Sequence, residues 1–82
     1  SGIQVYPNPA TSFINVVPKG QEVSDWQVDI VAADGQVVQR NVFEQTKIMT
    51  VNFQNKLAAG TYFVRATDLA GKNTVMSSFI VP

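Results

Sequence analysis

Residues 26–30 read Trp26-Gln27-Val28-Asp29-Ile30, and this alternation of apolar and polar residues decides the fold. Successive side chains of a β-strand point to opposite faces, so Trp26, Val28 and Ile30 share one face. Gln27 and Asp29 lie on the other face. A strand with one dry and one wet face favours antiparallel pairing over a hydrophobic core.

The same period of two recurs along the chain at residues 49–53 and 62–66, with turn residues between the runs. At Asp34-Gly35 the sequence has the pair that is favoured where a tight hairpin needs positive φ. These signals predict seven short strands, at residues 3–6, 12–17, 26–32, 36–43, 47–54, 61–67 and 73–81. The expected fold is therefore all-β, a seven-stranded antiparallel β-sandwich of the immunoglobulin-like kind.

The alternation within each strand also predicts which aromatic side chains are buried and which are exposed. Trp26 and Tyr62 fall with the apolar residues of their runs, so we expect both in the core. Phe13 and Phe63 have the opposite phase from their apolar neighbours. We expect these two rings at the surface, where they would contribute to a contact surface.

The length of 82 residues predicts one domain, residues 3–82, and Ser1-Gly2 at residues 1–2 has the form of a scar left by tag removal. Six basic and six acidic residues cancel, and the basic residues are scattered. The chain therefore lacks the basic patch that is typical of proteins that bind nucleic acid or an anionic membrane surface. Its apolar stretches are only a few residues long, which argues against direct membrane insertion.

The sequence contains no histidine and no cysteine, which removes the usual general base, nucleophile and structural zinc ligands. Asp34 is expected to be used by its turn. The other carboxylates are expected to be solvated surface charges rather than a catalytic pair. They are Glu22, Asp25, Asp29, Glu44 and Asp68. We therefore expect no enzyme activity, no cofactor and no bound metal.

Two short motifs near the ends of the chain remain as candidate functional sites, and each marks the end or the start of a strand. Val5-Tyr6-Pro7-Asn8-Pro9-Ala10 should end the first strand, because proline cannot donate to a ladder. Leu57-Ala58-Ala59-Gly60-Thr61-Tyr62 leads into the penultimate strand, which Gly60 would start through its backbone freedom. We call their central parts the Pro-Asn-Pro motif (residues 7–9) and the Gly-Thr-Tyr motif (residues 60–62).

With these motifs in order and a closing strand up to Val81, residues 3–82 resemble the type A C-terminal sorting domains of the type IX (Por) secretion system of Bacteroidota. The resemblance implies a non-catalytic signal at the end of a larger cargo protein. It implies export through the periplasm to the outer membrane or cell surface. The implied partners are the outer-membrane translocon and a sortase-like signal peptidase, which cuts upstream of the domain before the cargo is attached to the surface.

The resemblance also implies which residues form the sorting signal. They are Pro7, Asn8, Pro9, Gly60, Tyr62, Lys72, Phe79, Ile80 and Val81. Members of this family commonly carry lysines through the last strand, whereas here Lys72 is followed by none. If that strand lies at a sheet edge, its unpaired backbone groups suit a partner strand and weak strand-mediated self-association.

A second function fits the same strand pattern. An immunoglobulin-like or fibronectin-like module for adhesion or carbohydrate binding would also be a small sandwich, and an exposed Phe63 would suit it. The position of the domain in the full-length gene product separates the two, because a sorting domain must end its chain.

Overall fold

The computed structural model describes residues 2–20 and 23–82, and the described part consists of seven β-strands and their connections. In chain order they are β1 (Ile3–Tyr6), β2 (Phe13–Pro18), β3 (Ser24–Ala32), β4 (Val37–Thr46), β5 (Met49–Asn52), β6 (Gly60–Asp68) and β7 (Asn73–Val81). Their number and order confirm the strands predicted from the sequence. Ser1 of the expected tag scar and the Glu22 carboxylate lie outside the described residues.

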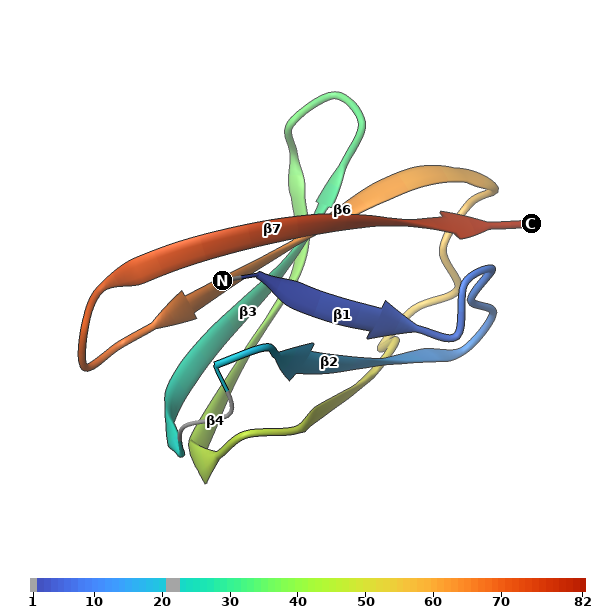
Figure 1. The fold of residues 1–82 in the computed structure, drawn as a ribbon. Coiled ribbons are helices and arrows are strands. Elements are labelled where there is room, and N and C mark those ends of the chain that lie inside the picture. The colour runs from blue at the N-terminus through green and yellow to red at the C-terminus, as the bar shows by residue number, and fades with distance from the viewer. Residues whose placement is uncertain (1, 21–22) are drawn as a thin grey trace.

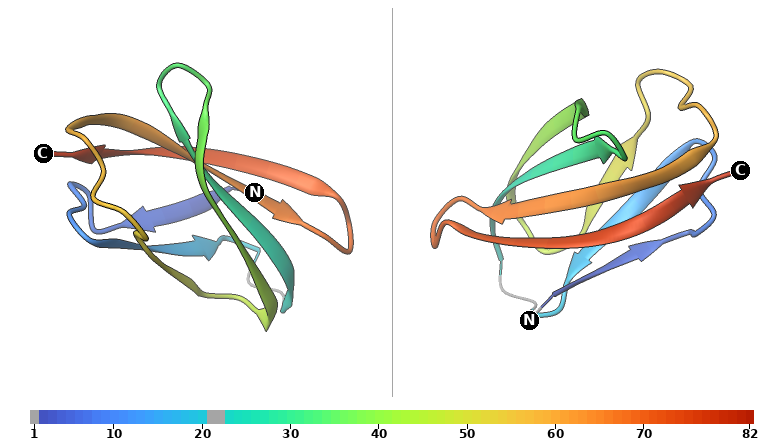
Figure 2. Two further views of the ribbon diagram at one scale, coloured as in Figure 1. Left: turned by 180° about the vertical axis from the view of Figure 1, so that it is seen from behind. Right: turned by 90° about the horizontal axis from the view of Figure 1, so that it is seen from above.

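The strands form two sheets that face each other, as Figures 1 and 2 show. One sheet has the order β1-β2-β5 and the other the order β4-β3-β6-β7. Every pair is antiparallel. The expected two-layer sandwich is therefore confirmed. In Figure 1 the C-terminal end of β7 lies on the same side of the molecule as the loop that follows β1.

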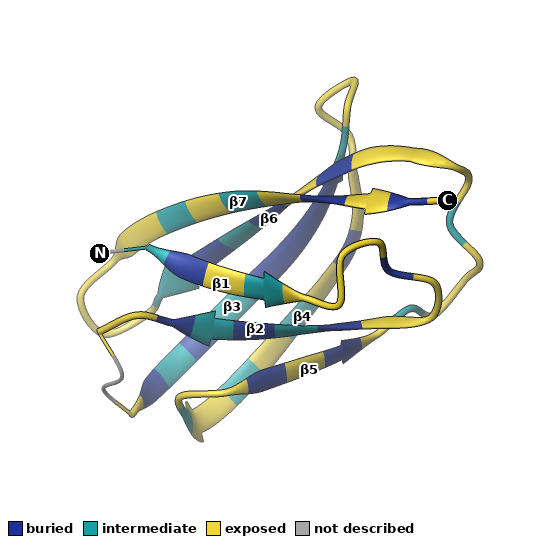
Figure 3. Cartoon of the chain, turned by 45° about the vertical axis from the view of Figure 1, so that its right-hand side comes forward, coloured by how far each residue is buried: buried dark blue, intermediate teal, exposed yellow. Residues whose placement is uncertain are grey.

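The core is built from alternate residues of the strands, which Figure 3 shows as bands of buried and exposed residues. Trp26, Val28 and Ile30 are all buried, as the alternation in β3 predicts. The indole Nε1 of Trp26 donates a hydrogen bond of 3.1 Å to the carbonyl of Thr46, so the polar atom of this ring is satisfied. Ile14, Val16, Met49, Val51 and Val64 complete the centre of the core.

The exposed aromatic residues and the tight hairpin also agree with the sequence. Phe13 is 37% exposed and Phe63 36% exposed, as their phase predicts. Between β3 and β4, Gly35 has a φ of 91°, a value that favours glycine. The Asp34 carboxylate accepts a hydrogen bond of 2.9 Å from the amide of Gln36, so this acidic residue is indeed used by its turn.

The boundary between β4 and β5 differs from the prediction of strands at 36–43 and 47–54. β4 continues to Thr46 because Thr46 still pairs with Ser24 of β3. β5 ends at Asn52, where the side chain of Gln39 takes over the pairing. Its Nε2 donates to the carbonyl of Asn52 at 2.9 Å, and its Oε1 accepts from the amide of Gln54 at 3.0 Å.

Candidate functional site

The Pro-Asn-Pro motif lies against the end of the last strand, although the two are far apart in sequence. The Oδ1 atom of Asn8 accepts a hydrogen bond of 2.9 Å from the amide of Ile80. The amide of Ala10 donates one of 2.8 Å to the carbonyl of Ile80. Both backbone groups of Ile80 are thus bound by residues 8–10. Ala10 is fully buried, and its role was not foreseen from the sequence.

The loop that follows β1 exposes residues 7–9 and buries Ala10. β1 ends at Tyr6, as predicted, and the peptide bonds that precede Pro7 and Pro9 are both cis. Pro7, Asn8 and Pro9 are exposed, while Ala10 turns inward to the core. The loop therefore shows a proline-flanked surface to solvent while its backbone and its asparagine hold β7.

The Gly-Thr-Tyr motif meets the same strand from the other side. Tyr62 is a direct partner of Phe79 in the ladder between β6 and β7. Their rings stack with centroids 5.7 Å apart, and Phe79 stacks on Phe53 at 5.9 Å. The Tyr62 hydroxyl donates a hydrogen bond of 2.6 Å to the carbonyl of Ala58. Tyr62 is buried, as predicted, and it ties the loop before β6 to the final strand.

The first residue of β6 has a backbone that suits glycine. Gly60 has a φ of 152°, which side-chain-bearing L-residues rarely adopt, and it pairs with Val81 in the ladder. Nothing lies within 4 Å of where a Cβ would be, so the requirement is one of conformation and not of space. Gly60 therefore lets β6 start opposite the last residue of β7.

The end of β7 alternates between core and surface. Phe79 is fully buried and Val81 is 6% exposed, whereas Ile80 between them is 50% exposed. Eight of the nine expected site residues thus gather at one end of the sandwich. They are Pro7, Asn8, Pro9, Gly60, Tyr62, Phe79, Ile80 and Val81. We call them the end cluster.

Lys72 lies apart from the end cluster. It sits in the turn between β6 and β7 with a φ of 58°, and its amide bonds to the carbonyl of Asp68. β7 runs for nine residues between this turn and Val81, a span of about 26 Å. The structure therefore does not bring Lys72 together with the other expected signal residues.

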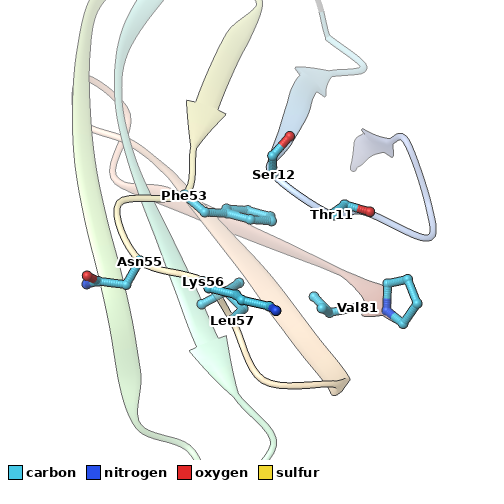
Figure 4. A pocket seen from close by; sticks show the side chains of 8 residues that line it. Thr11, Ser12, Phe53, Asn55, Lys56, Leu57 and Val81 are labelled. Atoms are coloured by element: carbon cyan, nitrogen blue, oxygen red, sulfur yellow. The ribbon is translucent and has the colours of Figure 1, made fainter.

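A groove of about 300 Å³ opens beside the end cluster (Figure 4). Thr11 and Ser12 line it on one side, next to the Pro-Asn-Pro motif, and Val81 on another. Phe53 and Leu57 form its apolar wall, and Lys56 supplies an ammonium group. Its lining comes from residues 11–12, 53, 55–57 and 81–82. The lining is thus mostly apolar, with one positively charged side chain.

The expectation that Asp29 is a solvated surface charge is wrong. Its side chain is 1% exposed, because Arg40 of β4 and Arg65 of β6 cover it from both sides. Arg40 Nε lies 2.7 Å from Oδ1, and Arg65 Nη2 lies 2.8 Å from Oδ2. Both arginines are direct ladder partners of Asp29. The positive charges in the polar phase of the two neighbouring strands were the signal that sequence reasoning missed.

This environment shifts the acidity of Asp29. Burial by itself raises the pKa of the carboxyl group. The hydrogen bonds and positive charges of Arg40 and Arg65 outweigh burial, so the pKa lies below its usual value. A carboxylate held ionised between two cations supports the sheet and is unsuited to act as a general acid.

Among the other carboxylates, Asp25 and Asp68 have structural partners. The Asp25 carboxylate accepts a hydrogen bond of 2.9 Å from the amide of Gln45. The Ser24 hydroxyl donates to Asp68 at 2.6 Å and, with the amides of Gly71 and Ala70, lowers the pKa of the Asp68 carboxyl. Residues 2–20 and 23–82 hold no group of three or more metal-ligating side chains, and no helix there is long and apolar enough to cross a membrane.

Comparison with known proteins gives one family match and two similar folds. The model of the family described as "Secretion system C-terminal sorting domain" matches residues 4–82. No curated protein matches the chain. Part of PorZ from Porphyromonas gingivalis, an essential bacterial surface component of the type IX secretion system, has the same fold. The TM-score is 0.76 at 24% identity, over 99% of this chain and 11% of PorZ.

A protein of the DUF3244 family from Bacteroides vulgatus also has this fold. The TM-score is 0.71 at 19% identity, over 98% of this chain and 83% of that chain. Its fold is described as an immunoglobulin-like β-sandwich, which confirms the fold class predicted from the sequence. The chain spans about a tenth of the length of PorZ, so that likeness concerns one domain of a larger protein.

Proposed function

Because this chain belongs to the family of secretion-system C-terminal sorting domains, we propose that it directs a larger cargo protein across the outer membrane by the type IX secretion system of Bacteroidota. The match over residues 4–82 confirms the family that the two end motifs predicted. The domain acts as a non-catalytic signal and is recognised as a folded unit.

The hydrogen bonds of Asn8 and Ala10 to Ile80 are the observation that carries this proposal beyond the family. Together with the pairing of β6 and β7, they bring both motifs of the family resemblance to one end of the sandwich. In our proposal the end cluster is the recognition surface. Of its exposed members, Pro7, Pro9 and Ile80 touch the translocon, while buried residues such as Tyr62 and Phe79 hold the last strand in place.

The later steps are part of the same proposal. The cargo passes through the periplasm, the outer-membrane translocon binds the domain, and a sortase-like signal peptidase cuts upstream of residue 3. The cargo then stays at the outer membrane or cell surface. The family assignment supports this route, and the presence of the same fold in PorZ, a surface component of the type IX system, is consistent with it.

A reporter fusion tests the proposal. Residues 3–82 are joined to the C-terminus of a periplasm-directed fluorescent protein in a Bacteroidota host with a working type IX system. We expect the reporter to leave the periplasm, and the same reporter without the domain to remain there. A fusion that folds and stays in the periplasm would refute the sorting function.

The exposed ring of Phe63 supports a second candidate, an adhesion or carbohydrate-binding module. Phe63 lies on the outer face of the four-stranded sheet, opposite Ser78 in the ladder. An exposed aromatic ring on a sheet face is a platform on which a sugar can stack. Binding to a glycan array that disappears in a Phe63→Ala variant would favour this function. The absence of any binding by the parent domain would rule out carbohydrate binding.

A further inference from the structure

The two open sheets of the described chain have four edge strands, β1, β5, β4 and β7. An edge strand exposes unpaired N–H and C=O groups, and proteins normally protect such edges against pairing with other chains. Short strands, prolines, charged side chains and bulges are the usual protection. The four edges of this sandwich differ in how far they are protected.

In the three-stranded sheet both edges are short and blocked. β1 has four residues and ends at Tyr6, directly before Pro7. β5 also has four residues, and the Gln39 side chain occupies the backbone groups of Asn52 and Gln54 beside it. Neither edge offers a run of backbone groups that is long enough for a further strand.

In the four-stranded sheet the edge at β4 is irregular and charged. Its register with β3 shifts between Ser24 and Trp26 and again between Ile30 and Val31. β4 also carries the charged and exposed residue Glu44. Shifts of register and charged side chains both disfavour a continuous ladder with another chain.

β7 has none of these four protections over most of its length, and the nearest strand beyond it is β1 of the other sheet, which packs beside it without pairing. It pairs with β6 in one register from Asn73 to Val81, without a shift. No residue of this strand is charged. Met76 is 56% exposed and Ile80 50% exposed, so two of the outward-facing side chains are apolar, and the other two, Thr74 and Ser78, are polar and uncharged. The nearby Arg65 is already engaged by Asp29 and adds no unpaired charge.

The contact with the Pro-Asn-Pro motif shows which backbone groups of β7 point outward. Ile80 directs its N–H and C=O away from β6, toward Asn8 and Ala10. Because this direction alternates along an antiparallel strand, Thr74, Met76 and Ser78 direct their backbone groups the same way. Within the described residues these groups have no hydrogen-bond partner.

We propose that the edge of β7 from Thr74 to Ser78 is where an uncharged, extended strand of the secretion machinery adds to this domain, an inference that rests on the proposed sorting function. Residues 8–10 already bind the same edge through backbone and amide groups, so the edge supports this mode of pairing. They also close its end, so the added strand stops before Ile80. The absence of charge along β7 matches a partner strand that is itself uncharged.

The small size of this open edge disfavours a second copy of the chain as the occupant. A stable interface between proteins uses about 20 to 30 residues on each side. A symmetric pairing of two copies through residues 74–78 would use only five residues from each. A strand that is presented by a larger partner can add contacts to the end cluster and to the apolar side chains of Met76 and Ile80.

Export of the reporter fusion by edge variants tests this proposal. Met76→Lys places a charge in the middle of the open edge, and Ser78→Pro removes one outward N–H without breaking a bond to β6. Val42→Lys is the matched control. Val42 is 59% exposed on β4, at the opposite edge of the same sheet, so the charge change is identical and the location differs.

We expect Met76→Lys and Ser78→Pro to lower export at least about tenfold, with Val42→Lys exported like the parent. Thermal unfolding of each purified fusion must match the parent, so that lost export reflects lost recognition. Normal export of both folded edge variants would overturn the proposal, as would an equal loss in Val42→Lys. A parent that is a dimer in light scattering, and that Met76→Lys makes monomeric, would assign the edge to a second copy instead. Failure of the parent fusion itself would refute the sorting function and not the choice of edge.

Discussion

The Oδ1 atom of Asn8 lies 2.9 Å from the backbone nitrogen of Ile80 and accepts its hydrogen bond across 72 residues of sequence. The amide oxygen of asparagine can take the place of a backbone carbonyl. Together with Ala10, it continues the pairing of β7 at the point where no further strand is present. The asparagine between the two prolines is thus a turn residue that also binds the last strand through its side chain.

Asn8→Ala should release the end of β7. The variant loses one hydrogen bond at an exposed position, so we expect the free energy of unfolding to fall by about 1 kcal/mol. The amide of Ile80 should exchange with solvent faster, while the amides of β3 keep their protection. Hydrogen exchange by NMR measures both. Asn8→Asp keeps the acceptor oxygen and is the control, and unchanged exchange at Ile80 in Asn8→Ala would contradict the contact.

Gly60→Ala should destabilise the domain through the backbone alone. A residue held in an unfavourable φ region costs about 1–3 kcal/mol, and the space around the new Cβ is empty. A synthetic domain with D-alanine at this position should be close to the parent, because a D-residue favours positive φ. Chemical denaturation of the three proteins gives the comparison. Equal destabilisation by both enantiomers would indicate a steric cause and contradict the conformational explanation.

Stability should fall in acid partly through Asp29. Its folded pKa lies below the unfolded value of about 3.9, so the ionised group stabilises the fold fully above that value. This contribution is lost as the pH falls through the folded pKa. Asp29→Asn should therefore be less stable than the parent at pH 7 and lose less stability on acidification.

Urea unfolding at pH 7 and in acid measures this difference. Asp68, whose pKa is also lowered, keeps part of the acid dependence in Asp29→Asn. A variant in which methionine replaces both Arg40 and Arg65 lacks the two cations. Burial then acts alone, so the pKa of Asp29 should rise. If the Asp29→Asn variant lost as much stability in acid as the parent, the ion pairs would not act as described.

Removing the charge of Lys72 should leave export unchanged, because this residue lies at the far end of β7 from the end cluster. Lys72→Asn suits the test, since asparagine tolerates the positive φ of 58° at this position. Surface display of the reporter fusion and its melting temperature are the readouts. Lost export with an intact fold would place the lysine in the signal after all.

The strand pattern of this chain could be predicted because period-two alternation and turn residues are local signals. Trp26, Val28 and Ile30 lie in the core as their spacing indicates, and Asp34-Gly35 forms its hairpin. The ends of β4 and β5 could not be predicted in the same way. The end of β4 depends on the pairing of Thr46 with Ser24 of β3. The end of β5 depends on the Gln39 side chain, which reaches from one sheet to the other, and no local pattern encodes that reach.

The arrangement of the candidate site could not be predicted from the sequence. The family resemblance singled out both motifs, but only the folded chain brings Asn8 to Ile80 and separates Lys72 from them. Asp29 shows the same limit. Its phase correctly places it on the outer face of the sheet, yet its burial follows from two arginines on neighbouring strands whose register the sequence does not specify.

The most direct test of the central claim is the protease-accessible fraction of the reporter fused to residues 3–82, measured on intact cells of two strains. One strain has a complete type IX system and the other lacks its outer-membrane translocon. We predict that the reporter is accessible at the surface or in the medium of the first strain and protected in the periplasm of the second. Equal protection of a folded fusion in both strains would contradict the account.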